Sequence, residues 1–238
     1  MGKAIARFFC AAIGVGALLP LQADEPAAGK SAALRSLEVP AEFRHLIRIP
    51  NFGEKSIAEF VQHVKDESGV RIEIDVAGLE RVNKQSIDRL RVQSVPFALP
   101  AAGHLEWAAL QVNGTLQFRG HSARIVPGEA DFLKYLSEPS AERLELAKKQ
   151  LRLEKDIAGA PAKDIIEYFV ERWELPILIQ PAQVNQPAAT VLADKQCQLP
   201  AETKSLRAWL ELMAKQMGSQ VVLKEEAFVI VPKNSIKR

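Results

Sequence analysis

The chain has 238 residues, of which 47% are hydrophobic and 25% charged, and its formal net charge is +2 at pH 7. This near-neutral balance argues against a nucleic-acid-binding protein, because nucleic-acid surfaces are strongly basic. The only cysteines are Cys10 and Cys197, too few for a disulfide-stabilised scaffold. The length suits two domains of about 80–90 residues, and domains of ~60 residues already fold alone.

Residues 1–23 have the pattern of a signal peptide. Lys3 and Arg7 form a basic start, residues 8–19 are apolar, and Ala23 precedes a candidate cleavage point. The apolar run is shorter than the ~20 residues of a membrane span. We therefore expect an exported mature chain that does not span the membrane, with an uncleaved anchor as the alternative. Cleavage leaves 238 − 23 = 215 residues with a net charge of zero, and Cys197 then has no disulfide partner.

The next segments predict a tether and the start of a first domain. Residues 24–40 are rich in Ala, Glu, Pro, Gly and Ser, which is typical of a flexible tether. The first domain is predicted over residues 41–128, with strand character at 43–49. Ser56 and Glu59 have the spacing of a capping box, which predicts that a helix begins there.

Apolar residues at helical spacing, and then at strand spacing, follow the capping box. The helical set is Ile57, Phe60, Val61 and Val64. Gly69 is a candidate helix end. The alternating strand set is Val70, Ile72 and Ile74.

The rest of the first domain is predicted to be a strand, a short helix and a hairpin. The strand is expected within residues 90–99 and at a sheet edge, because Pro96 has no N–H to donate. The short helix is expected at 105–112, and alternating runs at 115–119 and 122–126 predict the hairpin.

A helical linker and a second domain complete the chain. The linker is predicted over residues 129–153, and its helix at 140–153 is either a rigid spacer or packed on one domain. The second domain is predicted over 154–233 and the tail over 234–238. Its elements are a helix at 165–173, a strand at 175–179, a strand within 190–199, a helix at 206–217 and a hairpin at 220–224 and 227–231.

The two predicted domains share a hydrophobic pattern at an offset of 105 residues. Large apolar residues of 60–74 fall on large apolar residues of 165–179. Identical pairs are Leu105/Leu210, Glu106/Glu211, Ala109/Ala214, Gln111/Gln216, Ile125/Ile230, Val126/Val231 and Pro127/Pro232. Such a period corresponds to a small domain used twice. We therefore predict an α+β chain of two tandem small α/β sandwich domains, each helix–strand–strand–helix–strand–strand, joined by a helical linker.

This order of elements resembles the secretin and TonB short N-terminal domain family. The matching segments are 56–61 running into 69–74, 199–201 before the helix at 206, and the hairpin at 228–232. Two features depart from the family pattern: Glu174 stands where a glycine is expected, and the second helix of the first copy is short.

The resemblance implies a non-enzymatic periplasmic envelope protein that docks a protein partner. The implied partner is a secretin, an outer-membrane receptor or a TonB-type component. Docking by β-strand addition suits small sheets with short outer strands, and the strand with Pro96 is a candidate protected edge. The alternative is a soluble periplasmic protein that binds a small ligand or a cell-wall glycan between the copies.

We predict no catalytic, cofactor-binding or metal-ligating residue and no cofactor. The histidines have no metal-binding spacing; they are His45, His63, His104 and His121. Cys197 is expected to be a buried thiol within a strand. Trp107, Trp173 and Trp209 are each expected to pack in a core or, alternatively, to form an interface hot spot. An enzyme would require reactive residues brought together from distant positions.

Overall fold

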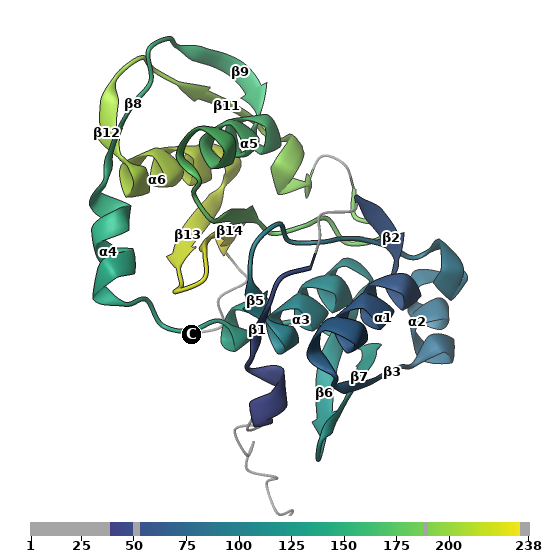
Figure 1. The fold of residues 1–238 in the computed structure, drawn as a ribbon. Coiled ribbons are helices and arrows are strands. Elements are labelled where there is room, and N and C mark those ends of the chain that lie inside the picture. The colour runs from purple at the N-terminus through teal and green to yellow at the C-terminus, as the bar shows by residue number, and fades with distance from the viewer. Residues whose placement is uncertain (1–38, 50–52, 188–189, 234–238) are drawn as a thin grey trace, which may run out of the picture. The chain divides into compact units, whose positions relative to one another are not determined.

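The computed structural model describes residues 39–49, 53–187 and 190–233. Within these residues the fold is α+β, with six α-helices and several small sheets (Figure 1). None of the described helices is long and apolar enough to cross a membrane. The predicted signal peptide (1–23), nearly all of the predicted tether (24–40) and the predicted tail (234–238) lie outside the described residues.

We call residues 39–137 the N-terminal half and residues 138–233 the C-terminal half. The elements of the N-terminal half are β1 (Leu46–Ile47), β2 (Glu54–Ser56), α1 (Ile57–Ser68), β3 (Arg71–Ile74), α2 (Val76–Asn83), β4 (Arg91–Gln93), β5 (Leu99–Pro100), α3 (Ala101–Gln111), β6 (Gly114–Arg119) and β7 (Ser122–Pro127). Three short 3-10 helices, Ala41–Phe43, Ile87–Arg89 and Phe132–Tyr135, accompany them.

Among the described residues of the C-terminal half there are ten helices and strands and one further 3-10 helix, Leu192–Asp194. They are α4 (Ala141–Lys148), β8 (Gln150–Arg152), β9 (Ile157–Pro161), α5 (Ala162–Trp173), β10 (Ile177–Ile179), β11 (Gln196–Leu199), β12 (Thr203–Ser205), α6 (Leu206–Met217), β13 (Ser219–Leu223) and β14 (Phe228–Pro232).

Both halves pair their strands in the same order. The three-stranded sheets are β3-β7-β6 and β10-β14-β13, each with a parallel pair followed by an antiparallel hairpin. The two-stranded sheets are β1-β5 and β2-β4 in the N-terminal half, and β8-β12 and β9-β11 in the C-terminal half. The parallel register also agrees, since the pairs Ile72–Ala123 and Ile177–Phe228 are 105 residues apart.

Local signals explain where the first helix of each half begins and ends. The predicted capping box is confirmed: the Ser56 N–H donates to the Glu59 carboxylate (2.9 Å), and the Glu59 N–H donates to Ser56 Oγ (3.2 Å). Gly69 ends α1 with φ 69°. Glu174 ends α5 with φ 54°, at a cost of about 1–2 kcal/mol for a residue with a side chain. The chain therefore makes the same left-handed turn in both halves.

A side-chain clamp also recurs at the same offset. The side chain of Gln111 accepts from the Gln93 N–H (2.8 Å) and donates to the Gln93 carbonyl (3.1 Å). The side chain of Gln216 makes the same two contacts with the backbone of Gln198, both at 2.8 Å. Each clamp joins the last turn of a helix to a strand, which accounts for the identical glutamines at this position.

Two predicted elements differ from the structure in the N-terminal half, and one helix was not predicted. The second helix begins at Ala101 instead of residue 105, so α3 is eleven residues long. All eleven residues are buried, so the sequence lacks the polar stripe that marks an ordinary amphipathic helix. Helix α2 occupies a segment without a clear predicted pattern, and Asp75 caps it. Pro96 lies between β4 and β5 and is not part of a strand.

The predicted helix at 140–153 is also shorter than expected. Helix α4 ends at Lys148, and the residues after it form β8, which pairs with β12. Leu151 and Leu153 are buried while Arg152 between them is exposed, an alternation that belongs to a strand. Ala147 is buried in the core of the C-terminal half, so α4 packs on that core.

Three apolar clusters hold the described residues together. One lies within the N-terminal half and contains Phe43, Phe60, Leu105 and Ile125 among others. A second lies within the C-terminal half around Trp209 and Phe169. The third joins the halves and consists of Val95, Leu99, Trp107, Phe132 and Leu136 with Leu178, Ala227, Val229 and Val231. Because of this third cluster, β14 is buried on both faces.

Replacement of Val229 by Arg tests this joining cluster. Val229 is fully buried, whereas Arg124, 105 residues earlier, is partly exposed on β7. An unpaired charge at position 229 should lower the free energy of unfolding by about 3–5 kcal/mol. Urea unfolding followed by tryptophan fluorescence measures the change. The control Val126→Arg, on the half-exposed face of β7, should cost less than about 1 kcal/mol, and equal costs for both variants would contradict the burial of β14 on two faces.

Candidate functional site

Among the histidines, His104 is part of the core. It is fully buried on α3, and its Nε2 lies 3.0 Å from the Ile47 carbonyl. Since a carbonyl only accepts, Nε2 carries the proton, and Nδ1 has no partner among the described residues. Burial lowers the pKa of His104 to about 4. Trp209, 105 residues later, donates in the same way to the Leu151 carbonyl (3.1 Å), so His104 fastens a strand to a helix.

His121 belongs to an exposed pocket of about 600 Å³ at the β6–β7 turn. Its Nδ1 lies 2.7 Å from the Glu42 carboxylate, a pairing also found in catalytic triads. Ser68 and Ser122 line the same pocket, but their hydroxyls donate to the carbonyls of Val64 and Arg119. No serine hydroxyl is bonded to His121 in the described structure, so this pocket lacks the contact that activates a nucleophile.

Cys197 and two of the three tryptophans are core residues, as predicted. Cys197 is fully buried in β11, and burial raises the pKa of its thiol. Trp209 is fully buried. Trp107 is buried in the joining cluster, and its Nε1 donates to the Gln93 carbonyl (3.0 Å). Trp173 is only half-buried.

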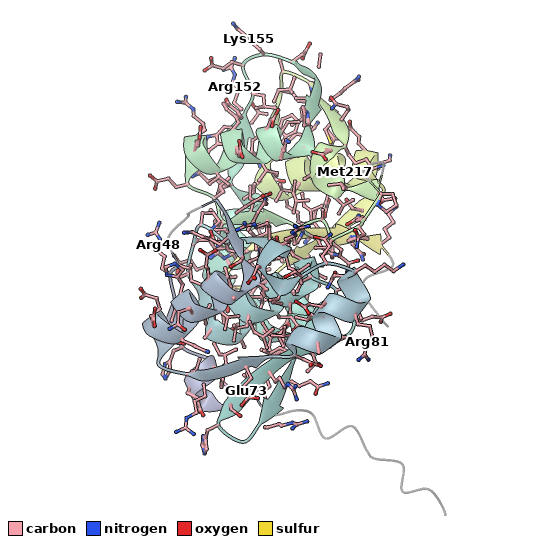
Figure 2. All side chains as sticks on the ribbon, turned by 90° about the vertical axis from the view of Figure 1, so that its right-hand side faces the viewer. Arg48, Glu73, Arg81, Arg152, Lys155 and Met217 are labelled. Carbon is pink, nitrogen blue, oxygen red and sulfur yellow. The ribbon has the colours of Figure 1, made fainter. Side chains whose placement is uncertain are left out.

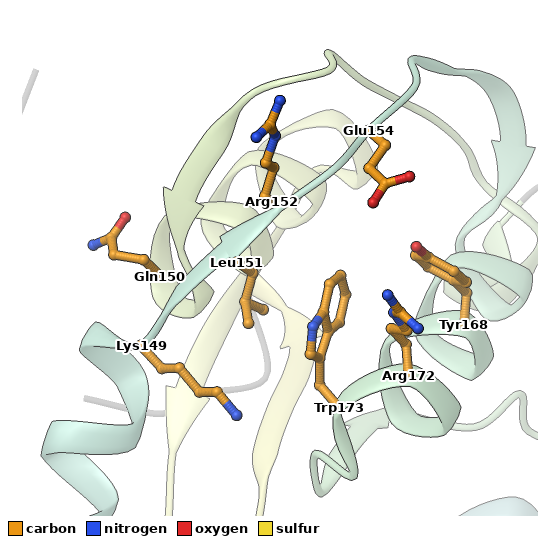
Figure 3. Close-up of a pocket in the computed structure, with 8 residues that line it drawn as sticks. All are labelled: Lys149, Gln150, Leu151, Arg152, Glu154, Tyr168, Arg172 and Trp173. Carbon is orange, nitrogen blue, oxygen red and sulfur yellow. The ribbon is translucent and has the colours of Figure 1, made fainter.

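Trp173 belongs to a pocket of about 430 Å³ between β8 and α5, which we call the β8–α5 pocket (Figure 3). Its lining residues are Lys149, Gln150, Leu151, Arg152, Glu154, Tyr168, Arg172 and Trp173. Figure 3 shows that Tyr168, Arg172 and Trp173 project from α5 toward the segment that carries Leu151 and Glu154. The pocket therefore combines a strand edge, an aromatic wall and charged side chains.

Helix α5 builds the aromatic wall of the pocket. Tyr168 and Arg172 are one helical turn apart and so lie on the same face. The Tyr168 and Trp173 rings meet edge to face, with centroids 5.6 Å apart, and Trp173 also packs against the buried Phe169 ring at 5.0 Å. Tyr168 remains 42% exposed. Tyr168 and Trp173, which we call the aromatic wall, pack against each other and offer a rigid apolar contact surface.

Strand β8 has one partner and one open edge among the described strands. The Leu206 N–H donates to the Lys149 carbonyl (2.8 Å), and the Leu153 N–H donates to the Glu202 carbonyl (3.1 Å). These bonds show that the odd-numbered residues turn their backbone groups toward the β12 side. In an antiparallel pair the backbone groups alternate between the two edges. The N–H and C=O groups of Gln150 and Arg152 therefore face the open edge.

The charges that line the pocket are unbalanced. Lys149, Arg152 and Arg172 are cationic, and Glu154 is the one carboxylate of the lining. None of these four side chains makes an ion pair or a hydrogen bond with another described residue. Glu167 and Glu171 are also exposed on α5 but do not line the pocket. Two of the three cationic charges thus have no counterpart within the lining.

The corresponding region of the N-terminal half has different chemistry. The residues 105 positions before Tyr168, Arg172 and Trp173 are His63, Glu67 and Ser68, respectively. Helix α1 thus offers neither the aromatic wall nor the cation of α5. The β8–α5 pocket is a feature of the C-terminal half.

A further pocket of about 440 Å³ is lined by residues of both halves, among them Leu46, Phe97 and Arg143. Its carboxylates are occupied: the Glu225 side chain accepts from the Ser140 N–H (2.6 Å), and the Glu226 side chain accepts from the Ser137 N–H (3.0 Å). These hydrogen bonds fasten the β13–β14 turn to residues 137–140. The carboxylates of this pocket therefore stabilise the fold through these hydrogen bonds.

Comparisons of the chain with protein-family models, with curated proteins and with solved structures found no match. Within the described residues, no group of three or more His, Cys, Asp or Glu side chains could hold a metal ion. The resemblance to the secretin and TonB short N-terminal domain family stays a prediction from the sequence.

The buried His104 predicts a specific acid sensitivity. Its pKa is about 4 in the folded chain against an ordinary 6.5, so the unfolded chain takes up the proton first as the pH falls. Stability from the neutral imidazole is complete above about pH 6.5 and is lost toward pH 4, by about 3 kcal/mol in all. Between pH 7 and pH 4.5, the free energy of unfolding should fall about 2–3 kcal/mol more in the wild type than in His104→Gln. Urea titrations at both pH values measure this, and parallel losses in the two proteins would contradict it.

Proposed function

We propose that this chain is a non-enzymatic, exported protein of the bacterial envelope that docks a protein partner. Its described residues form two tandem copies of one small α/β domain, one in each half. The matching strand order, the matching parallel register and the repeated glutamine clamp support the duplication. The resemblance supplies the class of partner: a secretin, an outer-membrane receptor or a TonB-type component of the periplasm.

The observation that carries the docking function is the open edge of β8 beside the aromatic wall of α5. An extended segment of a partner can pair with the backbone groups of Gln150 and Arg152, and Tyr168 and Trp173 can contact its side chains. Main-chain bonds give affinity in this mode, and side-chain pockets give specificity. The docking edge is thus β8, and Pro96 takes no part in it.

The pocket lined by both halves favours a second candidate function, the binding of a small ligand or cell-wall glycan. Both carboxylates of that pocket, Glu225 and Glu226, accept hydrogen bonds from the backbone. The charged side chains of the β8–α5 pocket, in contrast, make no ion pair or hydrogen bond with another described residue. Enzymatic activity has weaker support, since the exposed His121–Glu42 pair has no bonded nucleophile among the described residues. Docking at β8 therefore ranks first.

A proline at the open edge tests strand addition. Gln150 is the first residue of β8, where proline is tolerated, and Gln150→Pro removes an N–H that faces away from β12. Tagged full-length protein should capture its partner from crosslinked host envelopes, and the proline variant should capture at least ~10-fold less, about 1.4 kcal/mol. The control Gln150→Ala keeps the N–H and should capture normally. Equal capture by all three proteins would place the contact elsewhere.

Tyr168 tests the aromatic wall separately from the strand edge. Because Tyr168 is substantially exposed, Tyr168→Ala should change the free energy of unfolding by less than about 1 kcal/mol. As an interface hot spot it should still weaken binding by about 2 kcal/mol. Trp209→Ala should instead cost about 3–5 kcal/mol of stability. Thermal unfolding and capture, measured on both variants, separate the two roles; a Tyr168→Ala protein that captures as well as the wild type would remove the wall from the site.

A further inference from the structure

We propose that the segment docked along β8 is an acidic, extended peptide segment of the partner. This inference rests on the proposed docking function and names the chemistry of the occupant. It follows from the unpaired cations of the β8–α5 pocket together with the open backbone edge beside them.

The two faces of an added strand would meet different surfaces. Successive side chains of a strand point to opposite faces of the sheet. Figure 3 shows Leu151 on the side of α5, whereas Gln150 and Arg152 point away from it. One row of partner side chains would therefore lie against Tyr168 and Trp173, and the alternate row would lie beside Arg152.

Cations are available on both of these faces. Lys149 and Arg172 line the pocket on the α5 side, and Arg152 lies on the other face. Figure 2 shows that Arg152 and the nearby Lys155 both project outward from the ribbon. Carboxylates at successive positions of the docked strand would each find a cation, and hydrogen bonds between ionised groups are about twice as strong as neutral ones. A basic segment would meet like charges, which suppress binding.

A peptide fits this site better than an anionic glycan does. The open edge presents carbonyl groups as well as N–H groups, at Gln150 and Arg152. A peptide backbone offers donors and acceptors at the matching spacing. A sulfated or carboxylated glycan could engage the cations without any need for the Gln150 N–H, so the two occupants differ in their response to Gln150→Pro.

The N-terminal half already carries a negatively charged residue at the helix position that corresponds to Arg172. Arg172 lies near the C-terminal end of α5, and Glu67 occupies the corresponding place in α1. Arg172→Glu therefore places at this helix position a residue that the other half already carries there. Lys215→Glu on α6 is the matched control, because Lys215 is exposed and does not line the pocket.

The test uses the full chain and three labelled ten-residue peptides, in which Val residues are separated by adjacent pairs of Glu, Gln or Lys, so that each pair presents one side chain to each face of an added strand. Fluorescence anisotropy should give at least 10-fold tighter binding of the Glu peptide than of the Gln peptide, and weakest binding of the Lys peptide. Arg172→Glu should weaken Glu-peptide binding at least 10-fold and Gln-peptide binding less than 3-fold, whereas Lys215→Glu should change neither more than 2-fold. An increase from 50 to 500 mM NaCl should weaken the Glu peptide selectively.

The outcomes separate the inference from the docking function. Equal binding of the Glu and Gln peptides, both weakened by Gln150→Pro, would overturn the acidic occupant and leave strand docking in place. No binding of any peptide to the folded wild-type chain would overturn both. Binding of polygalacturonate that Arg172→Glu abolishes and Gln150→Pro leaves unchanged, with no preference for the Glu peptide, would assign the site to an anionic glycan instead. Circular dichroism of each variant checks that it is folded.

Discussion

Helix α3 is buried on both of its faces, and the contact between the two halves depends on that burial. One face, with Leu105, packs in the core of the N-terminal half, and the other, with Trp107, packs in the cluster that includes Val229 of the C-terminal half. The outer face of β14 is accordingly apolar. At the corresponding positions of β7, Arg124 takes the place of Val229, and it faces Asp75 at 3.4 Å. Burial of apolar surface on both sides of one helix joins the halves through a continuous set of contacts.

The two halves share one arrangement of strands and helices but differ in the side chains and environments at corresponding positions. His104 and Trp209 occupy equivalent positions and bond to equivalent strand carbonyls, one with an imidazole and one with an indole. The identical pair Glu106/Glu211 has diverged in environment. Glu106 is buried and accepts from the N–H groups of Leu116 (2.6 Å) and Asp131 (2.8 Å), and burial raises its pKa, whereas Glu211 is exposed and pairs with Arg207. The same kind of divergence gives the aromatic and cationic pocket to α5 and leaves α1 without it.

Elements with strong local signals could be predicted from the sequence. The capping box of α1, the apolar stripe of α6 and its end at Gly218, and both closing hairpins have the predicted places. The start of α3 was missed because burial on all sides removes the amphipathic period. The segment of β8 was predicted to be helical because Leu151 and Arg152 are also common in helices. Only its pairing with β12 makes this segment a strand. The pocket could not be predicted, since Lys149 and Arg172 come together through that pairing. The exposed Tyr168 on an otherwise polar face of α5 was the available signal.

The central claim is that a partner docks along the open edge of β8, beside Tyr168. Site-specific photocrosslinking in the host tests it most directly, with p-benzoylphenylalanine placed at position 168 and, as a control, at position 215 on the exposed face of α6. We expect one dominant crosslinked envelope protein from position 168, absent from position 215 and lost when Gln150→Pro is added. No crosslink from position 168, or the same products from both positions, would contradict docking at this edge.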